Sequence, residues 1–149
     1  MATYDDASPA DLGEPGPAGY TLSVVLDRPF DEVVTHLRAS LAAQGFGVLT
    51  EIDVRATMRA KLGVDVPDQV ILGACRPELA YRALDAAPSL AALLPCNVTV
   101  RDTGARTVVE AVDPAVMSTL EDRPEVSAVA AEARDRLSAA LGALAEAPD

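Results

Sequence analysis

The stretch Gly-Ala-Cys-Arg-Pro-Glu-Leu-Ala-Tyr at residues 73–81 joins an apolar strand to a helix. The apolar run at residues 69–74 predicts the strand, and the proline is typical of a first helical turn. The stretch Leu-Leu-Pro-Cys-Asn-Val at residues 93–98 passes from a helical piece into another strand. Both cysteines of the chain, Cys75 and Cys96, lie at these junctions. Because functional residues concentrate where regular elements meet loops, the junctions are the first place to look for a site.

Outward from these junctions, hydrophobic periodicity predicts the other elements. Apolar residues at 4-3-4 spacing (Phe30, Val34, Leu37 and Leu41) predict an amphipathic helix, for which Gly45 is the expected C-terminal stop. The pattern predicts strands at 20–26, 46–54, 69–74, 96–101 and 107–112, helices at 28–44, 77–86 and 123–145, a short helix or loop at 55–63, and a short helical piece at 88–95.

Capping and turn residues support these boundaries. Asp27 is the expected N-cap of the first helix. Asp122 and Glu125 have capping-box spacing at the start of the last helix. Residues 102–104, Asp-Thr-Gly, are typical of a hairpin turn between the last two strands.

The element order β-α-β-β-β-β-α, with a helical insertion between strands three and four, predicts an α+β fold. In such a fold a five-stranded antiparallel sheet carries its helices on one face. The length of 149 residues suits one domain, expected at 19–145. Residues 1–18 combine prolines, glycines and acidic residues, which predicts a disordered tail, and residues 146–149 are expected to fray.

Composition argues against several function classes. The chain has 23 acidic and 12 basic residues, a net charge of −11, and only 3% aromatic residues, so nucleic-acid binding is not expected. No apolar run approaches the roughly 18 residues of a membrane span, and no signal-peptide pattern precedes the domain. Two cysteines do not make a disulfide framework. A soluble, cytoplasmic protein with reduced cysteines is the expectation.

Several sequence blocks, in the same order, resemble the domain of unknown function 302 family. The blocks run from about Tyr20 to Leu144. They are 45–54 (GFGVLTEIDV), 61–63 (KLG), 73–75 (GAC) with Pro77 and Leu79-Ala80, and 93–98 (LLPCNV). The resemblance implies a curved antiparallel sheet similar to one repeat of the TATA-binding-protein fold, and a homodimer. It implies no activity, and fold likeness alone does not imply DNA binding.

The cysteines form the first candidate site. Cys75 precedes a helix start, where the helix dipole favours a thiolate, so it is expected to be the more nucleophilic. If strands three and four pair antiparallel, Cys75 and Cys96 lie close together. A functional thiol pair or a soft-metal site is then one interpretation, and two apolar cysteines packed in a sheet is the simpler one. Zinc is poorly supported, because the single histidine, His36, is expected on a helix surface.

A polar cluster forms the second candidate site. Glu51 and Asp53 alternate on strand two and so share a face, and Arg55, Arg59 and Lys61 follow as the densest basic group. The cluster is a candidate ligand-binding site. The alternative is a solvated strand with surface ion pairs of little energy.

No catalytic motif is present: the chain has no phosphate-binding glycine loop and no nucleophile elbow. No motif identifies a cofactor. Tyr81 is expected in the core or at a dimer interface. The leading hypothesis is a non-enzymatic dimeric module that binds a small molecule or a protein partner. Its rival is a thiol-dependent redox or soft-metal protein that uses both cysteines.

Overall fold

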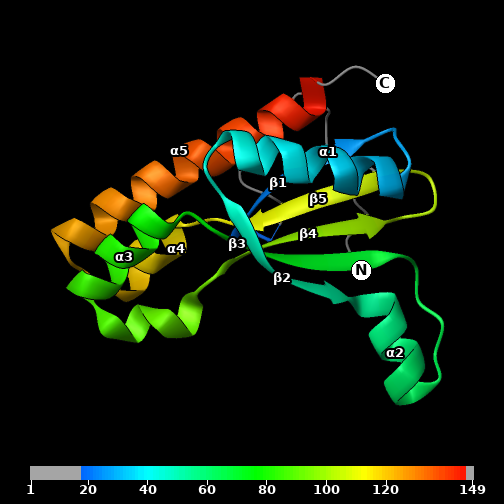
Figure 1. The fold of residues 1–149 in the computed structure, drawn as a ribbon, viewed down its shortest axis with the longest axis horizontal. Coiled ribbons are helices and arrows are strands. Elements are labelled where there is room, and N and C mark those ends of the chain that lie inside the picture. The colour runs from blue at the N-terminus through cyan, green and yellow to red at the C-terminus, as the bar shows by residue number, and fades with distance from the viewer. Residues whose placement is uncertain (1–17, 147–149) are drawn as a thin grey trace.

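The computed structural model describes residues 18–146, which form a five-stranded antiparallel sheet with helices (Figure 1). The strand order is β1-β5-β4-β3-β2, so β1 and β2 are the two edges. The strands are β1 (Thr21–Leu26), β2 (Gly47–Asp53), β3 (Gln69–Cys75), β4 (Cys96–Asp102) and β5 (Thr107–Val112). The helices are α1 (Phe30–Ala43), α2 (Val54–Leu62), α3 (Pro77–Ala86), the 3₁₀ helix η2 (Pro88–Leu93), α4 (Ala115–Leu120) and α5 (Pro124–Glu146).

Two helices, α1 and α5, lie along one face of the sheet, as Figure 1 shows. Alternate strand residues point at these helices, because successive side chains of a strand face opposite sides. The main core therefore joins strand residues such as Leu22, Leu72 and Val98 to Leu37 of α1 and Leu141 of α5. The predicted α+β class, with an open antiparallel sheet, is confirmed.

A second, smaller core lies beyond one end of the sheet. It joins α3, η2 and α4 to the N-terminal half of α5, through residues such as Leu79, Leu90, Met117 and Val129. Figure 1 shows these helices gathered at one end of the molecule, whereas α2 projects from the other end. Since α5 has 23 residues, it is long enough to belong to both cores.

Some element boundaries differ from those predicted. The first helix begins at Phe30 with Pro29 at its cap position, and Asp27 instead pairs with Arg106 at 3.1 Å. The last helix begins at Pro124, so Asp122 lies too early to be its cap. Proline suits a first helical residue because it lacks a backbone N–H, and an N–H at that position would have no intrahelical partner.

The structure also settles one ambiguous segment and adds one short helix. Residues 54–62 form a helix, and the six-residue α4, which the sequence pattern did not predict, follows β5. The expected tail at residues 1–17 and the last residues, 147–149, lie outside the described part of the chain. Within residues 18–146, no helix combines the length and the apolar character needed to cross a membrane.

Candidate functional site

A small apolar cavity lies where the two cores meet. Its volume is about 30 Å³, and we call it the Arg76 cavity. Its wall includes residues 74–76 at the β3–α3 junction and residues 94–96 at the turn into β4. Apolar side chains complete it, among them Met117 of α4 and Val129 of α5. Both junctions singled out in the sequence thus form one site.

The sheet register brings the two junctions together. Ala74 pairs with Cys96 across β3 and β4, so Cys75 is one residue away from the partner of Cys96. The strand ends at Cys75, and Pro77 begins α3 directly after Arg76. The expected closeness of the two cysteines agrees with this register and with their shared cavity wall.

Arg76 is the one ionised side chain in the cavity wall, and only 16% of it is exposed. Its Nη2 lies 3.6 Å from a carboxylate oxygen of Glu78, whose own side chain is 82% exposed. The buried Nε has no hydrogen-bond partner among the described residues. A buried donor without a partner costs free energy comparable to a lost hydrogen bond, so this atom is unusual in a folded protein.

The end of α1 is shaped around the same arginine. Gly45 adopts a positive φ of 82°, the expected C-terminal stop, and a Cβ there would lie 2.9 Å from Arg76 Nη1. The guanidinium therefore packs against the backbone just after α1. Helix C-termini favour cations, so this position stabilises a charged Arg76 at the cavity.

The cysteines are free thiols with raised rather than lowered pKa values. Burial raises the pKa of the Cys75 thiol. Burial, and to a lesser degree the charge of Cys75, raise the pKa of Cys96 from 9.0 to about 11. The expectation that the start of α3 lowers the pKa of Cys75 is wrong, because burial raises it. That Cys75 is the more nucleophilic of the two thiols stays a prediction. Both thiols are neutral at pH 7.

Because the pKa of Cys96 is raised, the free energy of unfolding depends on pH in the alkaline range. The unfolded chain ionises this thiol near its ordinary pKa, whereas the folded protein keeps it protonated until about pH 11. The stability that the neutral Cys96 thiol contributes is thus fully present below pH 9. As pH rises toward 11, the free energy of unfolding falls by up to about 1.4 kcal/mol per pH unit. We expect urea unfolding to show this decline, with a shallower decline in Cys96→Ala. Equal slopes in both proteins would contradict the burial of a neutral thiol.

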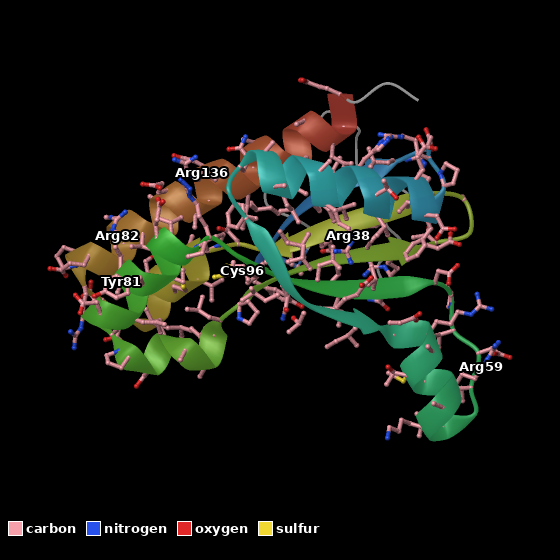
Figure 2. All side chains as sticks on the ribbon, viewed as in Figure 1. Arg38, Arg59, Tyr81, Arg82, Cys96 and Arg136 are labelled. Atoms are coloured by element: carbon pink, nitrogen blue, oxygen red, sulfur yellow. The ribbon has the colours of Figure 1, made fainter. Side chains whose placement is uncertain are left out.

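The polar cluster predicted from the sequence is exposed and divided between two hollows. Glu51 and Asp53 face α1, in a groove of about 280 Å³. Asp53 also borders a second hollow with Arg55 and Arg59. Lys61 lies outside both. Figure 2 shows Arg59 on α2 and Cys96 near the other end of the sheet, so the two candidate sites are separate.

The charges of this cluster are largely paired within the chain. Glu51 lies 2.7 Å from Arg38, Arg55 lies 3.6 Å from Asp68, and Arg59 Nε donates to Asp65 at 2.9 Å. The Asp53 carboxylate accepts a hydrogen bond from the backbone N–H of Ala56 at 2.9 Å. Exposed pairs of this kind contribute about 0–1 kcal/mol each, which agrees with the simpler interpretation of a solvated surface.

Asp53 is the N-cap of α2, and its loss has a predictable cost. We expect Asp53→Ala to destabilise the protein by about 1 kcal/mol, because a helix N–H loses its acceptor. Asp53→Asn, which keeps a capping oxygen, should cost much less. Amide hydrogen exchange would locate the change in α2, which has no buried side chain. Equal stability of Asp53→Ala and the wild type would contradict the capping role.

Two other predicted placements need correction or refinement. Tyr81 is 73% exposed, and Figure 2 shows it at the outer surface of α3, so a core position is wrong, whereas the alternative position at a dimer interface stays a prediction. The residue lies on the outer side of that helix because Leu79 and Ala83 form its buried face. His36 is half-buried, and its Nδ1 accepts a hydrogen bond from Nη2 of Arg28. Within residues 18–146, no group of three or more His, Cys, Asp or Glu residues could hold a metal ion.

The burial of Arg76 is the feature that the sequence did not reveal. The only signal was its place between Cys75 and Pro77, at a junction already marked as a candidate. Arginine is rarely buried, so the pattern alone favours a surface position. Its burial depends on contacts with distant elements, namely the end of α1 and the wall of the cavity.

The fold and the cavity define a class: α+β proteins with an open antiparallel sheet and a small site at the junction of two cores. Within this class, the chain belongs to the family described as domain of unknown function DUF302, which matches residues 22–144. It is similar to the solved structure of an uncharacterized conserved DUF302 protein from Bacillus stearothermophilus. That similarity has 28% identity and a TM-score of 0.76, over 83% of this chain and 96% of the other. No curated protein matches the chain.

Proposed function

We propose that the protein is a non-catalytic, homodimeric binding module that takes a small ligand in the Arg76 cavity. The observation that carries the proposal is the buried Nε of Arg76, which has no acceptor among the described residues. An apolar wall with a charged side chain in it is a common composition of a small-molecule site. The two unpaired cysteines suit a reducing compartment, so we place the module in the cytoplasm.

A panel of small compounds tests the ligand site by thermal unfolding. We expect at least one compound to raise the Tm of the wild type but not that of Arg76→Met, which keeps the length of the side chain and removes its charge and donors. Arg82→Gln is the matched control, because Arg82 lies on the same helix and is about half exposed. A panel in which no compound distinguishes Arg76→Met from the wild type would refute the proposal.

We propose the β2 edge and α2 as the surface that binds a second copy. Every residue of β2 except Val48 is exposed, and α2 has no buried residue. Leu49, Ile52 and Leu62 are large apolar side chains exposed on these two elements. An edge strand carries unpaired backbone groups that can pair with another strand. The residues Glu51, Asp53, Arg55, Arg59 and Lys61 would then form the polar rim of this contact.

Light scattering at micromolar concentration tests the dimer. We expect the wild type to be a dimer and Ile52→Lys to be a monomer, since the substitution places a charge in the apolar part of the contact. Leu93→Lys in η2, also at an exposed apolar residue, should remain a dimer. A monomeric wild type would refute the dimer, and a monomeric Leu93→Lys beside a dimeric Ile52→Lys would move the contact to the insertion.

The rival function, a thiol-dependent or soft-metal protein, has one observation in its favour. Cys75, Cys96 and Met117 all contribute to the wall of the same cavity, which gathers soft sulfur atoms. The raised thiol pKa values weigh against redox chemistry, because the thiolate is the reactive form. We therefore expect both thiols to react slowly with an alkylating reagent until denaturant is added. A fast thiol or a reversible disulfide in the folded protein would favour the rival.

A further inference from the structure

The face of the sheet opposite α1 and α5 carries side chains that are buried without belonging to either core. Val25 of β1 pairs with Val108 of β5, and Glu110 lies two residues further along β5. These residues alternate with core residues such as Val24 and Val109, so they point to the opposite face. Val25 is 4% exposed, Val108 1% and Glu110 7%. Neither valine is a member of the main core or of the smaller one, so a third set of contacts buries them.

Among residues 18–146, no helix lies along this face. Both α1 and α5 pack on the other face, and Figure 1 shows α3, η2 and α4 beyond one end of the sheet and α2 at the other. In addition, β1 is an edge strand, so only one neighbouring strand shields its side chains. A valine in that position would be open to water on two sides, whereas Val25 is almost fully buried.

The cover of this face comes from the chain itself. The side chains are buried within a single chain, so a second copy is not required to explain their low exposure. Apart from residues 18–146, the chain has residues 1–17 and residues 147–149. Three residues span at most about 10 Å, which is too short to pass from the end of α5 around the edge of the sheet. Residues 1–17 are the remaining segment.

The N-terminal segment has the starting point and the length for this role. It leads directly into β1 at Thr21, whose hydroxyl donates a hydrogen bond to Glu110 on the same face. Gly19 has a positive φ of 78°, a conformation that lets the chain reverse its direction just before the strand. Seventeen extended residues span about 56–60 Å, whereas the six residues of β1 span about 20 Å.

The composition of the segment suits the face of a sheet rather than its edge. Three of its residues are proline, which has no backbone N–H to satisfy and favours an extended chain. Met1, Tyr4 and Leu12 supply large apolar side chains for contact with Val25 and Val108. By itself such a segment buries too little apolar surface to fold, which is why its composition predicts disorder. The face of the sheet supplies the missing apolar surface.

From these observations, we propose that residues 1–17 fold back across the face of the sheet opposite α1 and α5 and cover Val25 and Val108. The family match begins at residue 22, so this cover is an addition to the domain that the family shares. A partner that uses the same face has to displace the segment first. The proposal is independent of the Arg76 cavity and of the dimer contact on β2 and α2, and its failure leaves both unaffected.

Nuclear magnetic resonance on the whole wild-type chain tests the cover directly. We expect the non-proline amides of residues 1–17 to have heteronuclear NOE values close to those of the sheet. Side chains of the segment should also give NOE contacts to the methyl groups of Val25 and Val108. Low heteronuclear NOE values throughout the segment would overturn the proposal, since they report free motion on the ps–ns timescale. In a mixture of labelled and unlabelled chains, contacts found only between chains would assign the cover to a second copy and overturn it too.

Proteolysis at Tyr4 and Leu12 measures how often the segment leaves the face. Chymotrypsin should cleave Val25→Asp at these two residues at least about tenfold faster than the wild type, because a carboxylate beneath the segment removes its apolar contact. Val64→Asp is the matched control, the same change at an exposed valine, and should be cleaved at the wild-type rate. Equal rates in Val25→Asp and the wild type would overturn the proposal.

A second variant avoids any damage to the sheet. Tyr4→Asp combined with Leu12→Asp alters only the segment and leaves residues 18–149 unchanged. We expect the heteronuclear NOE values of residues 1–17 to fall and the contacts to the methyl groups of Val25 and Val108 to disappear. Wild-type values and contacts in this variant would show that the apolar side chains of the segment do not hold it on the sheet, and would overturn the proposal.

Discussion

Substitution of Gly73 by alanine should destabilise the protein by about 2–3 kcal/mol, because a strand residue there has no space for a side chain. A Cβ at this position would lie 2.8 Å from Cγ of Pro95 and would also overlap the Thr50 hydroxyl. Thr50 is exposed and can turn away, but Pro95 is a rigid ring. Backbone strain is not the reason, since Gly73 is not among the glycines with positive φ.

The matched control is Gly47→Ala, the same change in the neighbouring strand. The closest atom to a Cβ on Gly47 would be the Cys75 carbonyl oxygen at 3.9 Å, an ordinary contact. We therefore expect Gly47→Ala to change stability by less than about 1 kcal/mol, and a gain is expected from the smaller entropy of the unfolded chain. Thermal unfolding should show Gly73→Ala melting about 5–10 °C below the wild type. A Tm within a degree of the wild type would mean that Pro95 can move, and would contradict the close packing at this junction.

The largest loss of stability is expected from Leu37→Ala, at about 2–5 kcal/mol. Leu37 is fully buried between α1 and the sheet, in the main core. Its removal costs the transfer free energy of the lost methyl groups and leaves a cavity that the surrounding strands and α5 fill only in part. Urea unfolding should show a lower midpoint with an unchanged slope.

Two further variants separate packing from helix propensity. Leu120→Ala makes the same change at the end of α4, where the side chain is 64% exposed and lies outside the proposed dimer contact, and should stay within about 0.5 kcal/mol of the wild type. Leu37→Met keeps the volume of the side chain and should cost less than about 1.5 kcal/mol. A cost for Leu120→Ala similar to that of Leu37→Ala would contradict the explanation by packing in the core.

Most of the helices and strands could be predicted because their signals are local. The 4-3-4 stripe that includes Leu37 predicted α1, and Gly45 ended it where the structure does. The short helix α4 was missed because six residues are too few to show a helical period. The N-cap at Asp27 was misassigned because Pro29 holds the cap position and α1 begins at Phe30.

The position of the candidate site could be predicted from the sequence, but the chemical properties of its residues could not. The two junctions around Cys75 and Cys96 were marked by their place between elements, and the register of β3 and β4 brings them together. The predicted direction of the Cys75 pKa shift was wrong. The position of a residue relative to a helix can be read from the sequence, whereas its desolvation cannot. The roles of Asp53 as a helix cap and of Glu51 as the partner of Arg38 likewise depend on where neighbouring elements end and pack.

The sequence by itself determined the element types, the α+β class and the family, because alternation, helical period and ordered blocks are properties of neighbouring residues. Only the tertiary structure decided that Arg76 is buried and that its Nε finds no acceptor among the described residues. The physical reason is that burial is a sum over contacts from distant segments: Gly45, Met117 and Val129 are far from residue 76 in sequence and close to it in space. A buried arginine and a cavity of about 30 Å³ beside it therefore arise only when the two cores meet.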